Sequence, residues 1–286
     1  MITERTLVSV AVVAGCFVAM LLGETIAPLR RSVESKVRRL VRNLTTGGIS
    51  LAVVTLLQTP ILIPVARWTE TNHIGLLNWA PLPNGVRIVL AVVLLDYTLW
   101  FWHWANHKVP LLWRFHLVHH IDLDLDASTA LRFHFGEQAL SIACRALQII
   151  VIGASSFSVW IWQMILFASI LFHHSNMRLP IGLEKWLVRL IVTPRMHGIH
   201  HSDFMNETNS NWSSILSCWD YLHRTLDLDV PQEAIDIGVP AYRQPHEVTI
   251  GKILARPFLR QRADWLMPDG RIAIRTHSGP HGKMEE

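Results

Sequence analysis

The chain alternates between long apolar runs and short polar segments, a pattern typical of helices that cross a membrane. The first run covers residues 7–28, and a helix of that length spans a bilayer at ~1.5 Å per residue. Further runs cover residues 44–66 and 86–102. Two shorter runs, residues 139–153 and 157–172, predict a helical hairpin whose two ends return to the same side. The pattern therefore predicts an all-α, integral-membrane helical bundle.

The basic segment at residues 30–42 sets the predicted orientation, because Lys- and Arg-rich loops stay on the cytoplasmic side of a membrane. With this segment inside, three crossings and one hairpin bring every histidine cluster to the cytoplasmic face. A cleaved secretory signal is disfavoured, because the first apolar run continues past Cys16. We therefore expect a multi-pass membrane protein with a histidine-rich di-metal site on the cytoplasmic face.

Composition supports a lipid-facing protein and divides the chain into three parts. Twelve Trp and ten Phe beside only three Tyr fit indoles placed near membrane interfaces. We expect N-terminal transmembrane helices and a basic loop in residues 1–85, a catalytic domain in residues 86–225 and a soluble C-terminal tail in residues 226–286. The net charge of +4 is modest, and nothing in its placement points to nucleic acid. The three cysteines are far apart and predict neither a disulfide framework nor a thiolate metal site.

Histidines carry the candidate chemistry, and most of them are clustered. On a helix, residues spaced three or four apart share one face, so HxxxH and HxxHH aim two or three imidazoles at one point. Neutral imidazole is the commonest protein metal ligand, and this many rings exceed the capacity of one ion. Eleven of the 16 histidines lie between positions 103 and 201: His103, His107, His116, His119, His120, His134, His173, His174, His197, His200 and His201.

Several polar residues could have structural roles in place of functional ones. If the clustered histidines were only packed core residues, each ring would need a hydrogen-bond partner. This requirement disfavours a purely structural role for the whole cluster. Asp96 lies inside an apolar run seven residues before His103, where a carboxylate is costly and suggests a functional partner. The alternating acids of the 122–126 segment lack the Gly and Glu of a calcium loop, so we expect a solvated loop. We expect a structural role for His223. The remaining four histidines are expected to lie at the surface: His73, His246, His277 and His281.

Five segments together resemble the fatty acid hydroxylase / sterol desaturase superfamily of integral-membrane di-iron oxygenases. They are DYTLWFWHWANH, LWRFHLVHHIDLDLDASTALRFHFGE, LFHHSNMRLP, TPRMHGIHHS and NWSSILSCWDYLHRT, and they cover roughly residues 96–225. The resemblance implies two iron ions held almost wholly by histidine, O2 as oxidant and hydroxylation or desaturation of a lipid. It also implies a separate electron donor, either a cytochrome b5-like protein or a ferredoxin with its reductase, because no such domain is fused to the chain.

The resemblance also implies roles for individual residues. Asp96, Glu137 and Asn211 match polar positions expected to orient imidazoles or support bound water. His173 is a weaker candidate for a metal ligand than its neighbour His174. Phe135 stands where the family usually has Pro, and Trp104 stands where Arg often follows the first histidine. The implied metal ligands are His103, His107, His116, His119, His120, His134, His174, His197, His200 and His201.

Two alternative functions use the same histidines. A metal-dependent membrane lipid hydrolase would activate water, but two-metal hydrolytic sites usually include bridging carboxylates, which are scarce in these clusters. A non-enzymatic metal transporter needs ligands along a path near the bilayer midplane, whereas these gather at one face. Imidazole alone does not select iron over zinc.

Overall fold

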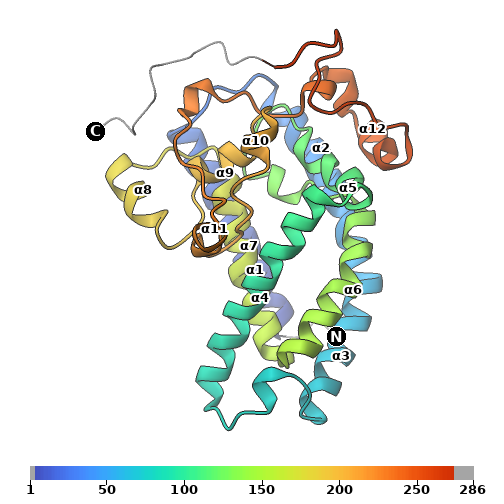
Figure 1. Cartoon of the computed structure of the whole chain (residues 1–286), viewed down its shortest axis with the longest axis vertical. Helices are drawn as coiled ribbons and strands as arrows, with labels where there is room; N and C mark the ends of the chain where they lie inside the picture. The colour runs from blue at the N-terminus through green and yellow to red at the C-terminus, as the bar shows by residue number, and fades with distance from the viewer. Residues whose placement is uncertain (1–3, 274–286) are drawn as a thin grey trace.

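The computed structural model describes residues 4–273, and within that range the chain is helical, with isolated β-bridges and no extended strand. The three cysteines are free. Figure 1 shows long helices side by side, with short helices and loops gathered at one end. The predicted all-α bundle is confirmed.

Five helical segments are long and apolar enough to cross a membrane. Each predicted apolar run coincides with one of these segments and extends past its end by at most two residues, and the predicted hairpin is formed by the last two segments. The segments are α1 (Glu4–Ile26), a largely helical segment from Lys36 to Asn78, α4 (Asn84–Lys108), α6 (Phe135–Ile152) and α7 (Ser156–His174).

The second segment is longer than its apolar run predicted. It comprises α2 (Lys36–Val53), a π-helical turn η1 (Val54–Gln58), α3 (Thr59–Thr71) and a short 3₁₀ turn η2 (Leu76–Asn78). Pro60 lies just after the π-helical turn, an irregularity of the kind that accompanies a residue without an N–H inside a continuous helix. Pro64 lies inside α3. The prolines therefore coincide with an irregular turn rather than with a break.

Two turns meet at the end of the bundle away from the short helices. Gly153 ends α6 in the left-handed region (φ 77°), and Gly75 has φ 96°. A Cβ added at Gly75 would collide with the backbone of Gly153, so the two turns pack backbone to backbone. Asn78 Nδ2 donates to the Gly153 carbonyl oxygen at 3.2 Å, which ties the α3–α4 connection to the α6–α7 turn.

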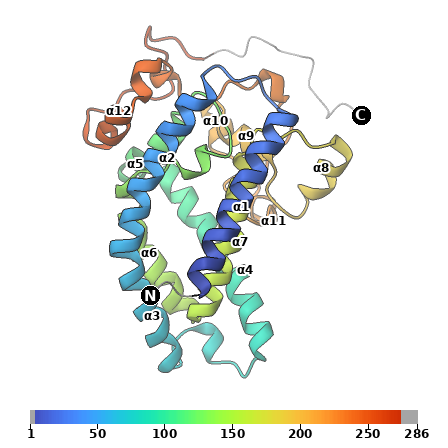
Figure 2. The ribbon, with the colours of Figure 1, turned by 180° about the vertical axis from the view of Figure 1, so that it is seen from behind.

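The opposite end holds the basic segment and the short helices that follow α4 (Figures 1 and 2). The C-terminal part does not stand apart from the bundle, because Tyr242 and Val248 pack against Leu117 in one hydrophobic cluster. The helices at this end include α5 (Pro110–His120), α8 (Ile181–Leu187), α9 (Pro194–His200), α10 (Met205–Thr208), α11 (Cys218–His223) and α12 (Ile250–Ala255). His277 and His281 lie outside the described residues.

The expectation of a solvated acidic loop at residues 122–126 is wrong. Asp122 is fully buried, and its carboxylate lies 3.1 Å from Arg39 Nη2 and 2.7 Å from Arg42 Nη2. Asp126 pairs with Arg39 Nη1 at 2.6 Å. Burial alone raises the pKa of the Asp122 carboxyl, but the guanidinium groups of Arg39, Arg132 and Arg42 hold that pKa well below its usual range. Part of the basic segment therefore serves as the internal partner of these acids.

We expect Arg39→Met to destabilise the fold, because it leaves Asp122 and Asp126 buried with one cation fewer. Breaking a buried ion-pair network of this kind lowers the free energy of unfolding by about 3–5 kcal/mol. Arg38→Met, at an exposed position of the same helix, should change it by less than ~0.5 kcal/mol. Thermal melting in detergent, followed by tryptophan fluorescence, measures both. Equal melting temperatures for the two variants would contradict the assignment.

Candidate metal centre

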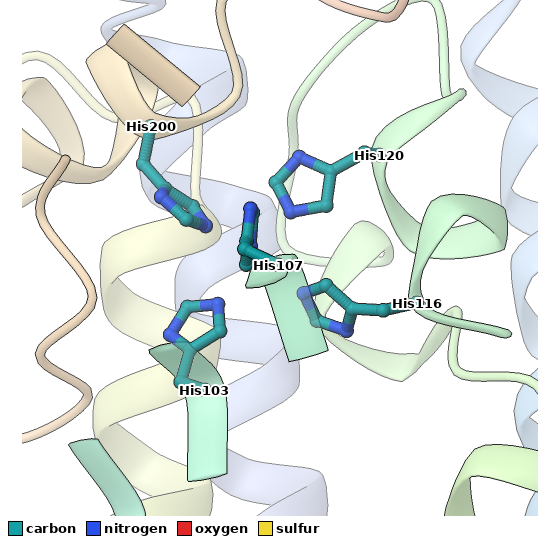
Figure 3. Close-up of side chains that lie close together, drawn as sticks. All are labelled: His103, His107, His116, His120 and His200. Carbon is teal, nitrogen blue, oxygen red and sulfur yellow. The ribbon is translucent and has the colours of Figure 1, made fainter. Parts of the chain in front are cut away.

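Three helices bring five imidazoles together in a first histidine group. His103 and His107 lie one turn apart near the end of α4, His116 and His120 lie one turn apart on α5, and His200 ends α9. One ring nitrogen from each lies within 4.8 Å of one from every other. Figure 3 shows the five rings arranged around a common centre.

A second histidine group lies beside the first and shares two of its helices. It contains His119 of α5, His174 at the end of α7, His197 of α9 and His201 directly after α9, again with ring nitrogens within 4.8 Å of one another. The rings of His120 and His201 stack across the two groups at 4.4 Å between centroids. The HxxHH spacing of α5 and of α9 thus divides each motif between both groups, because adjacent residues on a helix point in different directions.

Backbone carbonyls fix the tautomer of three rings. His103 Nδ1 lies 2.8 Å from the Trp212 carbonyl, His174 Nδ1 lies 2.7 Å from that of Ile170, and His200 Nδ1 lies 2.7 Å from that of Ser210. A carbonyl oxygen only accepts hydrogen bonds, so each Nδ1 carries the proton. In a neutral ring the lone pair is then on Nε2, the atom left free to bind a metal.

Unpaired nitrogens in the first group fit a bound cation. The Nε2 atoms of His107, His116, His120 and His200 are buried and have no hydrogen-bond partner among residues 4–273. Burying polar atoms without partners is costly. The donor set is all nitrogen, which suits a transition ion rather than magnesium or calcium.

The second group shows the same fit through close contacts. His174 Nε2 lies 3.0 Å from both His119 Nε2 and His197 Nε2, and His201 Nε2 lies 3.1 Å from His197 Nε2. Because His174 Nε2 holds a lone pair, this convergence is favourable only when protons or a cation lie between the nitrogens. Nitrogen ligands from four rings match the coordination number of a transition ion.

Burial keeps the rings of His119, His200 and His201 uncharged. It lowers the pKa of His200 to about 3, although the hydrogen bond to the Ser210 carbonyl acts in the opposite direction. Burial followed by the neighbouring imidazoles lowers the pKa of His119 and His201 well below the usual value. Neutral rings at neutral pH have lone pairs available, so a metal ion does not have to displace protons from them.

The three residues that were expected to orient imidazole rings make different contacts in the structure. Glu137 Oε1 accepts a hydrogen bond from His116 Nδ1 at 3.1 Å, directly behind the first group. Asp96 Oδ2 instead accepts from the Leu216 backbone and from Trp219 Nε1, so it holds the 215–219 segment rather than a ring. Asn211 has φ 53° and donates to the Met196 carbonyl, which supports the backbone of α9.

A positioning residue that the sequence did not single out is Asp220. It is fully buried, and its two oxygens accept from the backbone N–H groups of Trp212 and Ser213. Trp100 Nε1 also donates to it, at 3.0 Å. Asp220 thereby holds the loop whose Trp212 carbonyl faces His103. An acid within the otherwise apolar and aromatic SCWDYL segment was the available signal.

Two of the eleven clustered histidines, and His223, lie outside both groups. His134 caps α6, with its Nδ1 accepting from Gly136 N at 2.9 Å and its Nε2 facing the Leu254 carbonyl at 3.1 Å. Both ring nitrogens therefore have partners, and the structure does not support the expectation that His134 is a metal ligand. His173 packs on His197 at 4.1 Å without joining its group. His223 stacks on Trp100 at 4.0 Å.

A bundle of membrane-length apolar helices with two adjoining histidine groups at one end defines an integral-membrane metalloprotein. Residues 88–225 match the family model described as "Fatty acid hydroxylase". This match includes all nine histidines of the two groups. The region that carries both histidine groups is therefore similar to the fatty acid hydroxylase family.

The relatives of this chain include enzymes that act on lipids. It is 29% identical over 237 residues to an ornithine lipid hydroxylase, OlsE, of Rhizobium tropici, an alignment that covers 81% of this chain and 66% of that protein. Alkylglycerol monooxygenases are 27% identical over 130 residues in Xenopus tropicalis and 26% over 173 residues in Danio rerio. These alignments cover 46% and 60% of this chain, and 28% and 37% of the relatives. The matched regions are thus less than two thirds of each relative, and no solved structure matches the chain significantly.

Each histidine group should lose its own ion when one of its rings is removed. We expect His200→Ala and His174→Ala each to lower bound metal by about one of two equivalents, because the two variants disrupt different groups. Metal analysis of protein purified in detergent measures the stoichiometry. His246→Ala, whose side chain is 70% exposed, is the matched control and should keep both equivalents. Full metal content in both site variants would show that the groups are not ligand sets.

Proposed function

We propose that this protein hydroxylates a membrane lipid, using two iron ions, O2 and electrons from a separate donor protein. The convergence of nine histidines into two all-nitrogen groups carries this proposal. The named activities of the relatives, lipid hydroxylase and alkylglycerol monooxygenase, support the reaction class. In that class, a C–H bond, O2, two electrons and two protons give a C–OH group and water.

The protein residues supply position and environment in this proposal. The nine imidazoles of the two groups would hold the ions, and Glu137 would orient His116 through its Nδ1–H. When two irons are bound, they supply the redox chemistry that reduces O2 and inserts one oxygen atom into a C–H bond. His103 lies near the end of α4 and His174 at the end of α7, and both helices are long and apolar enough to cross a membrane, so a lipid chain would reach the site from the bilayer.

Orientation, electron supply and the ligand roles of individual histidines are part of the same proposal. The histidine end of the bundle is also the end that holds the basic α1–α2 connection (Figure 2), and basic loops favour the cytoplasmic side. A soluble or peripheral donor, such as a cytochrome b5-like protein or a ferredoxin with its reductase, would reach the site from there. Desaturation would differ only in the fate of the substrate radical.

The alternative functions receive less support from the geometry. Neither group contains a carboxylate among the residues described, whereas hydrolytic two-metal sites usually have bridging carboxylates. Both groups lie at one end of the bundle, not along a path through it. Glu137 is the carboxylate next to the first group, and its contact is with an imidazole.

The reaction can be tested with labelled oxygen. Cells that express the wild-type chain are grown under ¹⁸O2, and their lipids are compared with those of cells expressing His119→Ala. We expect the wild type alone to yield lipids that carry one labelled oxygen atom, with the variant reduced at least a hundredfold. Because His119 belongs to a metal group, the variant should still insert in the membrane. Lipid cleavage without label would favour the hydrolase, and equal products in both strains would refute the proposal.

A further inference from the structure

An arginine inside a membrane-spanning helix has no acidic partner. Arg145 lies near the middle of α6, and residues 4–273 supply neither an ion pair nor a hydrogen bond to its guanidinium. Its contact is the ring of Trp162 on α7, 5.6 Å from the guanidinium carbon. Ionisable residues inside membrane spans are rare and usually have a partner or a function. Arg145 therefore calls for a ligand that the protein itself does not provide.

A small cavity adjoins this arginine. Its volume is about 10 Å³, enough for one water-sized group. The walls come from four helices, α3, α4, α6 and α7, and two of these, α4 and α7, carry members of the histidine groups near their C-terminal ends. The lining residues are Leu62, Leu95, Arg145, Gln148, Ile149, Val159, Trp162 and Gln163.

Hydrogen-bond donors outnumber acceptors in this cavity. Trp162 is 2% exposed, and its Nε1 is buried without an acceptor among the described residues. Indole and guanidinium groups donate hydrogen bonds and cannot accept them. Gln148 Nε2 donates to Thr98 Oγ1 at 2.8 Å. The lining residues thus offer the amide oxygens of Gln148 and Gln163 as acceptors, against five guanidinium N–H groups and one indole N–H. The matching ligand is an oxygen atom that accepts hydrogen bonds, preferably one with negative charge.

We propose that Arg145 and Trp162 form a subsite for a carboxylate or carbonyl oxygen of the lipid substrate, an inference that rests on the proposed hydroxylase function. The cavity admits one oxygen-bearing group and excludes a phosphate headgroup. Arg145 follows Glu137 by eight residues, which places the subsite ~12 Å along the helix from the first histidine group. The subsite therefore selects lipids that are oxidised at a carbon remote from this oxygen.

Binding of three probes of similar length tests the subsite without requiring turnover. The probes are oleate, methyl oleate and cis-9-octadecene, titrated into metal-loaded protein in detergent. We expect the wild type to bind oleate at least tenfold more tightly than octadecene. Arg145→Met should remove that preference while leaving octadecene affinity, metal content and melting temperature unchanged. Trp162→Phe should weaken methyl oleate binding about threefold, and the exposed-site variant Arg38→Met should behave as wild type.

Two further variants keep the test decisive if Arg145→Met does not fold. Arg145→Lys should retain the preference for oleate, whereas Arg145→Gln should retain methyl oleate binding and lose the preference for oleate. Equal affinities of wild type, Arg145→Gln and Arg145→Lys for oleate would overturn the subsite. Arg145-dependent oleate binding in a protein that oxygenates no lipid would support the subsite and count against the hydroxylase function instead. Incorporation of labelled oxygen into a lipid, with no effect of the Arg145 variants on oleate binding, would support the hydroxylase function and overturn the subsite.

Discussion

The nitrogens of nine imidazole rings converge within a few ångströms of one another in two groups. These rings repel one another unless cations lie among them, so the surrounding structure has to hold them in place. Burial removes the option of protonation at His119 and His200, because it lowers the pKa of both rings. Hydrogen bonds from Nδ1 to fixed carbonyls remove the option of rotating away. A metal-binding arrangement is the one that makes such a cluster favourable.

The scaffold around the cluster depends on buried carboxylates that bind backbone and arginine groups. Asp220 fixes the loop behind His103. Glu24 of α1 accepts from the backbone N–H groups of Asn176 and Ala127, which joins the first helix to the segment after His174. Asp122 holds Arg39 and Arg42 of α2 just after α5. Each carboxylate connects segments that are distant in sequence, so the two histidine groups are built by the whole helical end of the molecule.

The sequence could predict those features that local spacing encodes. Apolar run length predicted the spanning helices, and HxxHH predicted that His116, His119 and His120 share one helical turn. Spacing could not predict that His119 turns to a different group from its two neighbours, because that depends on where α7 and α9 lie. The burial of Asp122 also went unpredicted, since its partners are about 80 positions away. For His134 the sequence could not decide between a metal ligand and a supporting residue, because a helix-capping histidine and a metal ligand look alike in a motif.

The most direct test of the account is anomalous X-ray diffraction from crystals of the purified protein, recorded on both sides of the iron absorption edge. The account predicts two iron peaks, one inside the group of His103, His107, His116, His120 and His200 and the other inside the group of His119, His174, His197 and His201. An active protein that shows no iron peak at these positions, or a single peak outside both groups, would contradict it.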